Sequence, residues 1–138
     1  MSAQEKATLD AQALQEFRKQ QNQLVEKTVA RLMEAKADFA HMGDKAESKM
    51  LAGFGFINRM LETTMEFDEI AIMEHQLEWS ANRLPHDGVP MPIMIKTLHV
   101  YRQVIEENLS AESSQRIGQQ LEWMVSWLEK AASGKAPE

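Results

Sequence analysis

The fold is decided by the stretch EFDEIAIMEHQLEWSANRLPHDGVPMPIMIKTLHVYRQVIEENL, which spans Glu66–Leu109. Apolar residues recur at helical spacing over residues 66–84 and again over residues 90–109, which predicts two helices. Between them lie Pro85, which stops a helix, and the pair Asp87-Gly88, which forms a turn. The second helix is apolar on nearly every side, so we expect it to be the most buried helix of the fold.

The length of 138 residues suits one domain over residues 1–138, and no segment carries a strand signal, so we expect one all-α globular domain with residues 1–7 and 133–138 disordered. The net charge of -6 argues against a nucleic-acid surface, because phosphate binding needs clustered Lys and Arg. The absence of Cys excludes disulfides and thiolate metal sites, and it fits a cytoplasmic location. No apolar run is long enough to cross a membrane, so we expect no membrane partner.

Three further helical segments flank the central stretch. Residues 8–40 form one helix that is bent, or two that meet, near Gln21-Asn22, where polar residues interrupt its apolar stripe. A second helix starts at a cap formed by Asp44, and a last helix starts at a cap formed by Ser110. Gly53 and Gly55 lie inside the second helix, and we expect another helix or a flat ligand to pack closely there and offset their low helix propensity.

The predicted helix over residues 66–84 has two apolar faces. Its main stripe faces the core, and nearly opposite lies a smaller group formed by Ile72, His75 and Trp79. Two apolar faces imply two contacts, so we predict that this smaller group is a dimer face.

No arrangement of residues indicates catalysis or a metal site. Among the four His residues, none has another His three or four residues away, so a two-His helical metal site is absent. The segment around Gly53 lacks the spacing of a phosphate-binding loop. We therefore expect no enzymatic activity, no metal and no cofactor.

The aromatic and Met residues at helical spacing have two interpretations: they are core residues, or they line a pocket for a planar hydrophobic ligand. The residues assigned to such a pocket are Phe54, Phe56, Phe67, Leu84, Leu98 and Tyr101.

The order of parts over about residues 25–129 resembles bacterial sensor globins. The matching parts are the segment Trp79–Leu84, the Gly88-Val89 corner, the helix with Leu98 and Tyr101, and an acidic-capped last helix. Sensor globins carry their haem-ligating His four residues before the Gly-Ile/Val pair, and this chain has Leu84 there. The chain is therefore more similar to the haem-less globin-like domains of stressosome regulators, and to the helical domains that precede cobalamin-binding modules.

The resemblance implies a globin-like bundle of five or six helices that senses or relays a signal and forms a homodimer. We expect it to bind a small hydrophobic ligand or a signalling protein partner. One alternative is a tetrapyrrole carrier that binds haem or a bilin, with His75, His86 or His99 as axial ligand. Another is a helical interaction bundle without any ligand.

Overall fold

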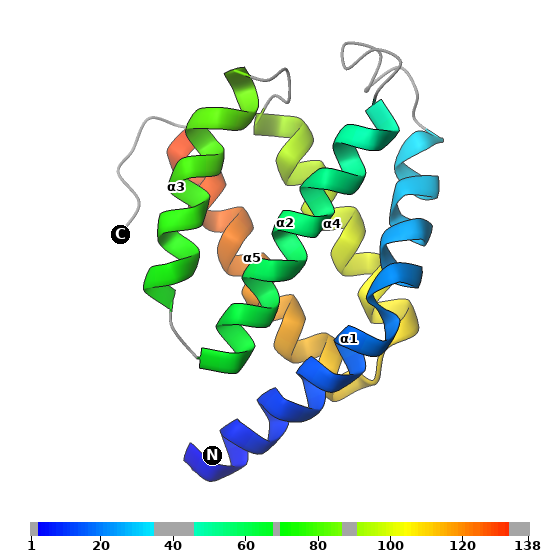
Figure 1. Ribbon diagram of the computed structural model, residues 1–138, viewed down its shortest axis with the longest axis vertical. Helices are drawn as coiled ribbons and strands as arrows, with labels where there is room; N and C mark the ends of the chain where they lie inside the picture. The colour runs from blue at the N-terminus through cyan, green and yellow to red at the C-terminus, as the bar shows by residue number, and fades with distance from the viewer. Residues whose placement is uncertain (1–2, 35–45, 68–69, 87–90, 133–138) are drawn as a thin grey trace.

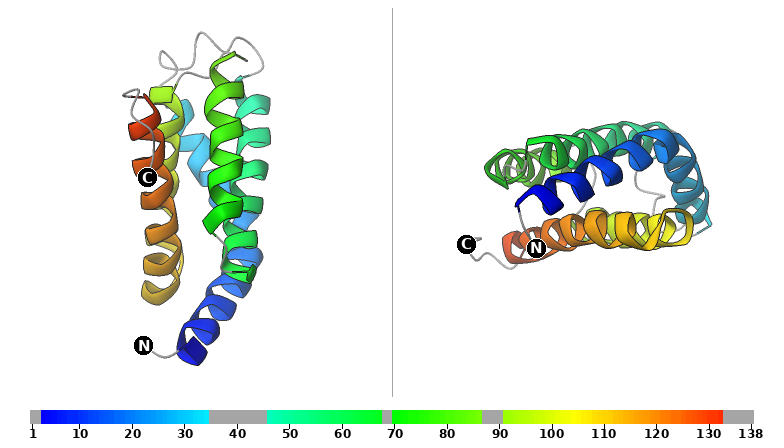
Figure 2. Two further views of the ribbon diagram at one scale, coloured as in Figure 1. Left: turned by 90° about the vertical axis from the view of Figure 1, so that its left-hand side faces the viewer. Right: turned by 90° about the horizontal axis from the view of Figure 1, so that it is seen from below.

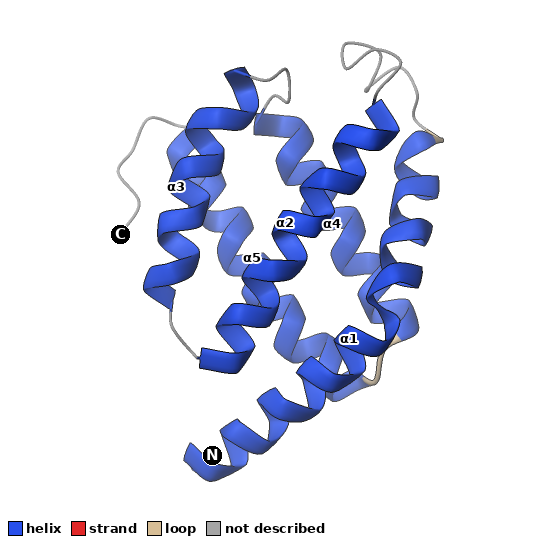
Figure 3. Ribbon diagram, in the orientation of Figure 1, coloured by secondary structure: helices blue, strands red, loops and turns tan. Residues whose placement is uncertain are grey.

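The computed structural model describes residues 3–34, 46–67, 70–86 and 91–132, without the side chains of residues 6, 7, 46, 70, 72 and 84–86. Within these ranges the chain forms five helices and no strand, so the all-α prediction is confirmed (Figure 3). The helices are α1 (Ala3–Met33), α2 (Ala46–Phe67), α3 (Ile70–His86), α4 (Met91–Asn108) and α5 (Ala111–Ala132).

The helices form two layers. Helices α2 and α3 make one layer and α4 and α5 the other, while α1 runs between them (Figures 1 and 2). Helix α1 packs against α2, α4 and α5, and α4 packs most extensively against α5. None of the helices in the described part of the chain combines the length and apolarity that crossing a bilayer requires.

Helix α1 is one continuous helix that changes direction about halfway along, which agrees with the bent form of the prediction (Figure 1). It starts at Ala3, so residues 3–7, which were expected to be disordered, belong to the helix. Its predicted stripe is buried at Leu14, Phe17, Leu24, Thr28 and Leu32, whereas Val25, the remaining member of the stripe, is partly buried. Residues 133–138 and the predicted Asp44 cap lie outside the described residues.

The boundaries of α3 differ from the prediction at both ends. Glu66 and Phe67 belong to the last turn of α2, and α3 begins only at Ile70. Helix α3 also continues through Pro85 and ends at His86. Proline removes one backbone donor and disfavours helical geometry in the residue before it, so a helix usually ends before a proline, and the last turn of α3 departs from that rule.

The prediction that α4 is the most buried helix was wrong. Five of its 18 residues are buried, compared with nine of the 22 residues of α5. The predicted α5 stripe is buried at Ile117, Leu121, Met124, Val125 and Leu128. The predicted cap is also confirmed, because the backbone N–H of Ser113 donates to Oγ of Ser110 at 3.2 Å.

The predicted close helix crossing at Gly53 and Gly55 was wrong. A Cβ atom added at either glycine would have no neighbour within 4 Å among the described residues. None of the described helices therefore compensates for the conformational freedom of these two glycines.

Replacing Gly55 with Ala is expected to stabilise the fold by about 0.5–1 kcal/mol, and Gly53→Ala by a similar amount, because alanine has the higher helix propensity. Urea denaturation followed by circular dichroism measures the change. Gly118→Ala is the matched control, because its Cβ would lie 3.2 Å from Nε of Arg102 and the neighbour would have to move. A loss of stability in both α2 variants would show that something outside the described residues needs the space.

Candidate functional site

Three residues of the predicted pocket are buried in the core. Phe54 of α2 is 1% exposed, and Leu98 and Tyr101 of α4 are 3% and 0% exposed. The rings of Phe54 and Tyr101 are in edge-to-face contact, with centroids 4.8 Å apart and planes at 66°. Phe54 and Tyr101 therefore fill the space between α2 and α4 with their own rings.

The structure does not bring Phe56 and Phe67 to the same place. Phe56 is partly buried on α2, where its ring centroid lies 5.8 Å from that of Trp79. Phe67 is 61% exposed at the end of α2. The side chain of Leu84 lies outside the described residues.

The residues of the predicted dimer face lie on α3. His75 and Trp79 are both exposed, and Trp79 is 53% exposed although it stands in the middle of the helix. The side chain of Ile72 lies outside the described residues. An exposed indole in contact with a second aromatic ring is typical of the anchors of protein interfaces.

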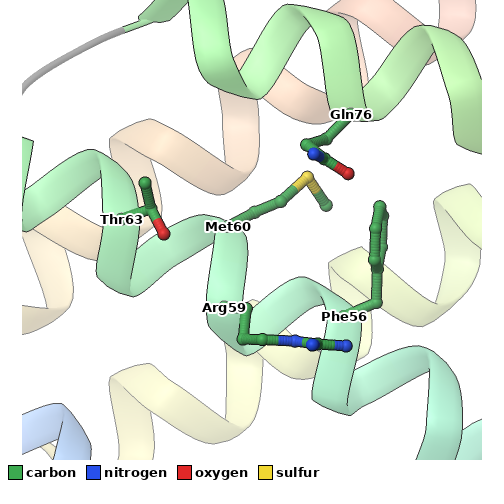
Figure 4. A pocket seen from close by; sticks show the side chains of 5 residues that line it. All are labelled: Phe56, Arg59, Met60, Thr63 and Gln76. Atoms are coloured by element: carbon green, nitrogen blue, oxygen red, sulfur yellow. The ribbon is translucent and has the colours of Figure 1, made fainter.

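A hollow of about 270 Å³ opens between α2 and α3 beside these aromatic rings. Its lining consists of Phe56, Arg59, Met60, Thr63 and Gln76. Figure 4 shows Met60 and Gln76 pointing toward each other from the two helices, with Arg59 extended below Phe56. We name the hollow together with Trp79 the α2–α3 face.

A second hollow of about 520 Å³, the α4 groove, runs along α4 at the end of α5. Its lining consists of Met91, Pro92, Ile95, Lys96, His99, Val100, Gln103 and Ala132. His99, one of the three proposed axial ligands, is exposed in this groove among apolar side chains. His75 lies on α3, and the side chain of His86 lies outside the described residues.

A chain of hydrogen bonds leads from the core to the surface. The buried Tyr101 hydroxyl donates to Oδ1 of Asn58 at 2.5 Å, and Nδ2 of Asn58 donates to Oε1 of Gln21 at 3.3 Å. Nε2 of Gln21 donates to Oε1 of Glu62 at 2.7 Å, and Arg18 lies 3.6 Å from the same oxygen. Burial raises the pKa of the Tyr101 phenol well above its ordinary value, so the hydroxyl keeps its proton and remains the donor.

This network explains the polar interruption in α1, which the sequence indicated without identifying its partners. Gln21 connects α1 to Asn58 and Glu62 on α2. Sequence reasoning missed Asn58 entirely. Its only signal was a polar residue four positions after Phe54 on an otherwise apolar helix face.

Helix α1 is also bound to α5 through two carboxylates. Glu16 accepts hydrogen bonds from the backbone N–H and hydroxyl of Ser110, at 2.6 and 2.9 Å, and from the hydroxyl of Ser113 at 2.7 Å. Asp10, which is 5% exposed, accepts hydrogen bonds from Nε of Arg116 and from its Nη2 at 3.2 Å. Both carboxylates act as structural contacts between helices.

Acid is expected to weaken the Glu16 contact. Burial favours a higher pKa for Glu16, but the backbone hydrogen bond from Ser110 and the hydroxyl hydrogen bonds from Ser113 and Ser110 together lower it below 4.5. The unfolded chain therefore binds the proton more readily, and this contribution to stability is present above pH 4.5 and lost as the pH falls through the lowered pKa. Glu16→Gln should show a smaller loss of stability below pH 4.5 than the wild type, as measured by urea denaturation at several pH values. Ser113→Ala removes one hydrogen-bond donor to Glu16, so its loss of stability in acid should be intermediate between those of Glu16→Gln and the wild type.

The lining of the α2–α3 hollow suits binding. Arg59 is the single charged side chain among the five that line the α2–α3 hollow. In the part of the chain that the structure describes, no three His, Asp or Glu side chains lie close enough together to hold a metal ion. The α2–α3 hollow thus offers apolar surface and one fixed cation.

Comparisons of the chain with protein-family models, with curated proteins and with solved structures find no match.

Proposed function

We propose that the chain is a non-enzymatic sensory or regulatory domain of globin-like type. It binds a small hydrophobic ligand or a partner protein at the α2–α3 face and signals through a homodimer formed at the same face. The globin-like part rests on the resemblance to haem-less sensor domains. The observation that supports the binding part is the position of Trp79, which is 53% exposed beside a hollow of about 270 Å³.

The packing of α3 suggests how a signal would pass. The described side chains of α3 that are buried are those of Met73, Leu77 and Ser80, so a small part of this helix anchors it to the core. Elements with few buried contacts shift at the lowest free-energy cost. A ligand or side chain that enters the hollow between α2 and α3 would therefore move α3, which also carries the exposed Trp79. Occupation of the hollow and association at the face would then be coupled.

The proposal predicts a concentration-dependent dimer that Trp79→Ala weakens by about thirtyfold, because an aromatic hot-spot residue contributes about 2 kcal/mol to binding. Sedimentation velocity over a range of concentrations measures the association. Gln23→Ala, at an exposed position on α1, is the control and should associate like the wild type. A wild-type chain that stays monomeric at every concentration would remove the dimer from the proposal.

One observation favours a second function, the binding of a planar tetrapyrrole in the α4 groove. His99 is the one His residue among the residues that line this groove, and Met91, Ile95 and Val100 supply apolar surface around it. An imidazole of this kind would supply an axial ligand to haem. Titration with haemin should then produce a Soret shift that His99→Ala removes and His75→Ala leaves unchanged. The absence of any shift in the wild type would exclude the haem form of this function.

A further inference from the structure

The exposed side of α3 carries charges of opposite sign toward its two ends. The exposed residues follow one another at intervals of three and one, so they share one side of the helix. These residues are Ala71, Glu74, His75, Glu78, Trp79, Asn82 and Arg83. The acidic residues Glu74 and Glu78 precede Trp79, and the basic residue Arg83 follows it.

This distribution of charge is complementary to that of a second α3 helix only when the two helices run antiparallel. If two copies of α3 lie parallel and in register, Glu74 faces Glu74 and Arg83 faces Arg83, and like charges repel. If they lie antiparallel, Glu74 of each copy faces Arg83 of the other. The midpoint between these two residues falls between Glu78 and Trp79, at the exposed indole.

We propose that the partner of the α2–α3 face is a second copy of the chain, with the two α3 helices antiparallel across a two-fold axis that passes between Glu78 and Trp79. The inference rests on the proposed function, since it names the partner at the same face. A two-fold interface repeats each contact twice and closes the assembly at two copies. Two Glu74–Arg83 ion pairs then flank a centre that contains both copies of Trp79 and of Glu78, where each Glu78 faces the Trp79 of the other copy.

The hollow between α2 and α3 is positioned to receive the indole of the other copy. Gln76, which lines the hollow, precedes Trp79 by three residues, which is about 4.5 Å along the helix axis at the α-helical rise. An indole close to the two-fold axis therefore lies within reach of the hollow of the opposite copy, and on entering it exchanges the Phe56 ring of its own chain, 5.8 Å away between centroids, for the Phe56 ring of the other copy. Arg59 at the hollow would lie against the face of that indole, an arrangement that attracts a cation to an aromatic ring.

The two kinds of contact have different roles in this dimer. Burial of Trp79 supplies affinity, because the indole is half exposed in the single chain. The ion pairs select the antiparallel direction, as charged residues at interfaces commonly do. Arg83 already has an interaction within its own chain, so its pairing with Glu74 of the other copy is an exchange of partners.

Charge reversal tests the direction of packing. Glu74→Arg and Arg83→Glu should each weaken the homodimer by about tenfold, because both ion pairs become repulsive. An equimolar mixture of the two variants should form heterodimers, since the introduced arginine then faces the introduced glutamate in one pair, and the native Arg83 faces the native Glu74 in the other. Native mass spectrometry separates the heterodimer from the homodimers by mass. The double variant E74R/R83E should recover the wild-type association.

Two controls detect any loss of folding caused by the change at Arg83. Arg83→Lys retains the charge and should associate like the wild type, and thermal melting measures the stability of every variant. If the mixture does not form heterodimers, or if both single variants associate like the wild type, the antiparallel arrangement is wrong. A dimer that persists through all of these changes leaves the homodimer of the proposed function intact. A wild-type chain that stays monomeric contradicts both the antiparallel arrangement and the homodimer of the proposed function.

A second pair of variants tests the position of Trp79. Trp79→Ala lacks the indole but keeps the hollow, whereas Thr63→Phe keeps the indole and fills the hollow. Each variant alone should associate at least about tenfold more weakly than the wild type, because both indole contacts are lost. Their mixture should form a heterodimer, because Trp79 of the Thr63→Phe chain enters the open hollow of the Trp79→Ala chain. A mixture that associates no better than either variant alone would show that the indole does not occupy the hollow.

Discussion

Replacing Arg116 with Ala is expected to destabilise the folded chain by about 3 kcal/mol, because it leaves a buried carboxylate without its partner. Asp10 is 5% exposed, and both of its carboxylate oxygens accept hydrogen bonds from the Arg116 guanidinium. The penalty arises from the unpaired charge of Asp10 more than from the lost attraction. Urea denaturation followed by circular dichroism at 222 nm measures the change in the free energy of unfolding.

A double variant separates these two contributions. Asp10→Leu combined with Arg116→Met removes both charges and replaces them with apolar side chains, so it should recover most of the stability lost in Arg116→Ala. If Arg116→Ala is as stable as the wild type, water must reach Asp10 and the ion pair contributes little to the attachment of α1 to α5.

Replacing Tyr101 with Ala is expected to destabilise the fold by about 4 kcal/mol, because it opens a cavity in the centre of the core. Tyr101 is 0% exposed, and its ring contacts that of Phe54 with centroids 4.8 Å apart. Thermal and urea unfolding measure the loss. The predicted loss exceeds that of any surface substitution proposed above.

Tyr101→Phe isolates the contribution of the hydroxyl group. The ring remains, but Oδ1 of Asn58 loses its donor at a position that is 6% exposed, so we expect a loss of about 1–2 kcal/mol. A double-mutant cycle with Asn58→Ala should give a coupling energy of about 1 kcal/mol between the two side chains, since they share one hydrogen bond. Additive effects would contradict the buried network.

The predictions that the structure confirms concern contacts within one helix. The apolar stripes of α1 and α5 and the Ser110 cap depend on residues three or four positions apart, and these spacings are visible in the sequence. Some errors concerned helix boundaries, at residues 3–7 and at both ends of α3, and others concerned interactions between helices. Gly53 and Gly55 indicated a close crossing, but no described residue lies within 4 Å of the place of a Cβ atom at either glycine.

Part of the candidate site was also predictable. The sequence placed Trp79 and His75 on the side of α3 away from its core stripe, and the structure places both at the surface. The hollow beside Trp79 was not predictable, because Met60, Thr63 and Gln76 meet only through the packing of α2 against α3. Phe67 is separated from Phe54 and Tyr101 because it lies at the end of α2, where it is 61% exposed, and not at the start of the next helix as predicted.

The amino-acid sequence by itself determined an all-helical chain, the core side of most of its helices and the cap that starts α5, because these features depend on neighbours along one helix. The tertiary structure alone decided that Gln21 meets Asn58, that Asp10 meets Arg116 and that Glu16 meets Ser110. These pairs lie 37, 106 and 94 residues apart. Their contact depends on the crossing angles and register of the packed helices, which many core residues determine together.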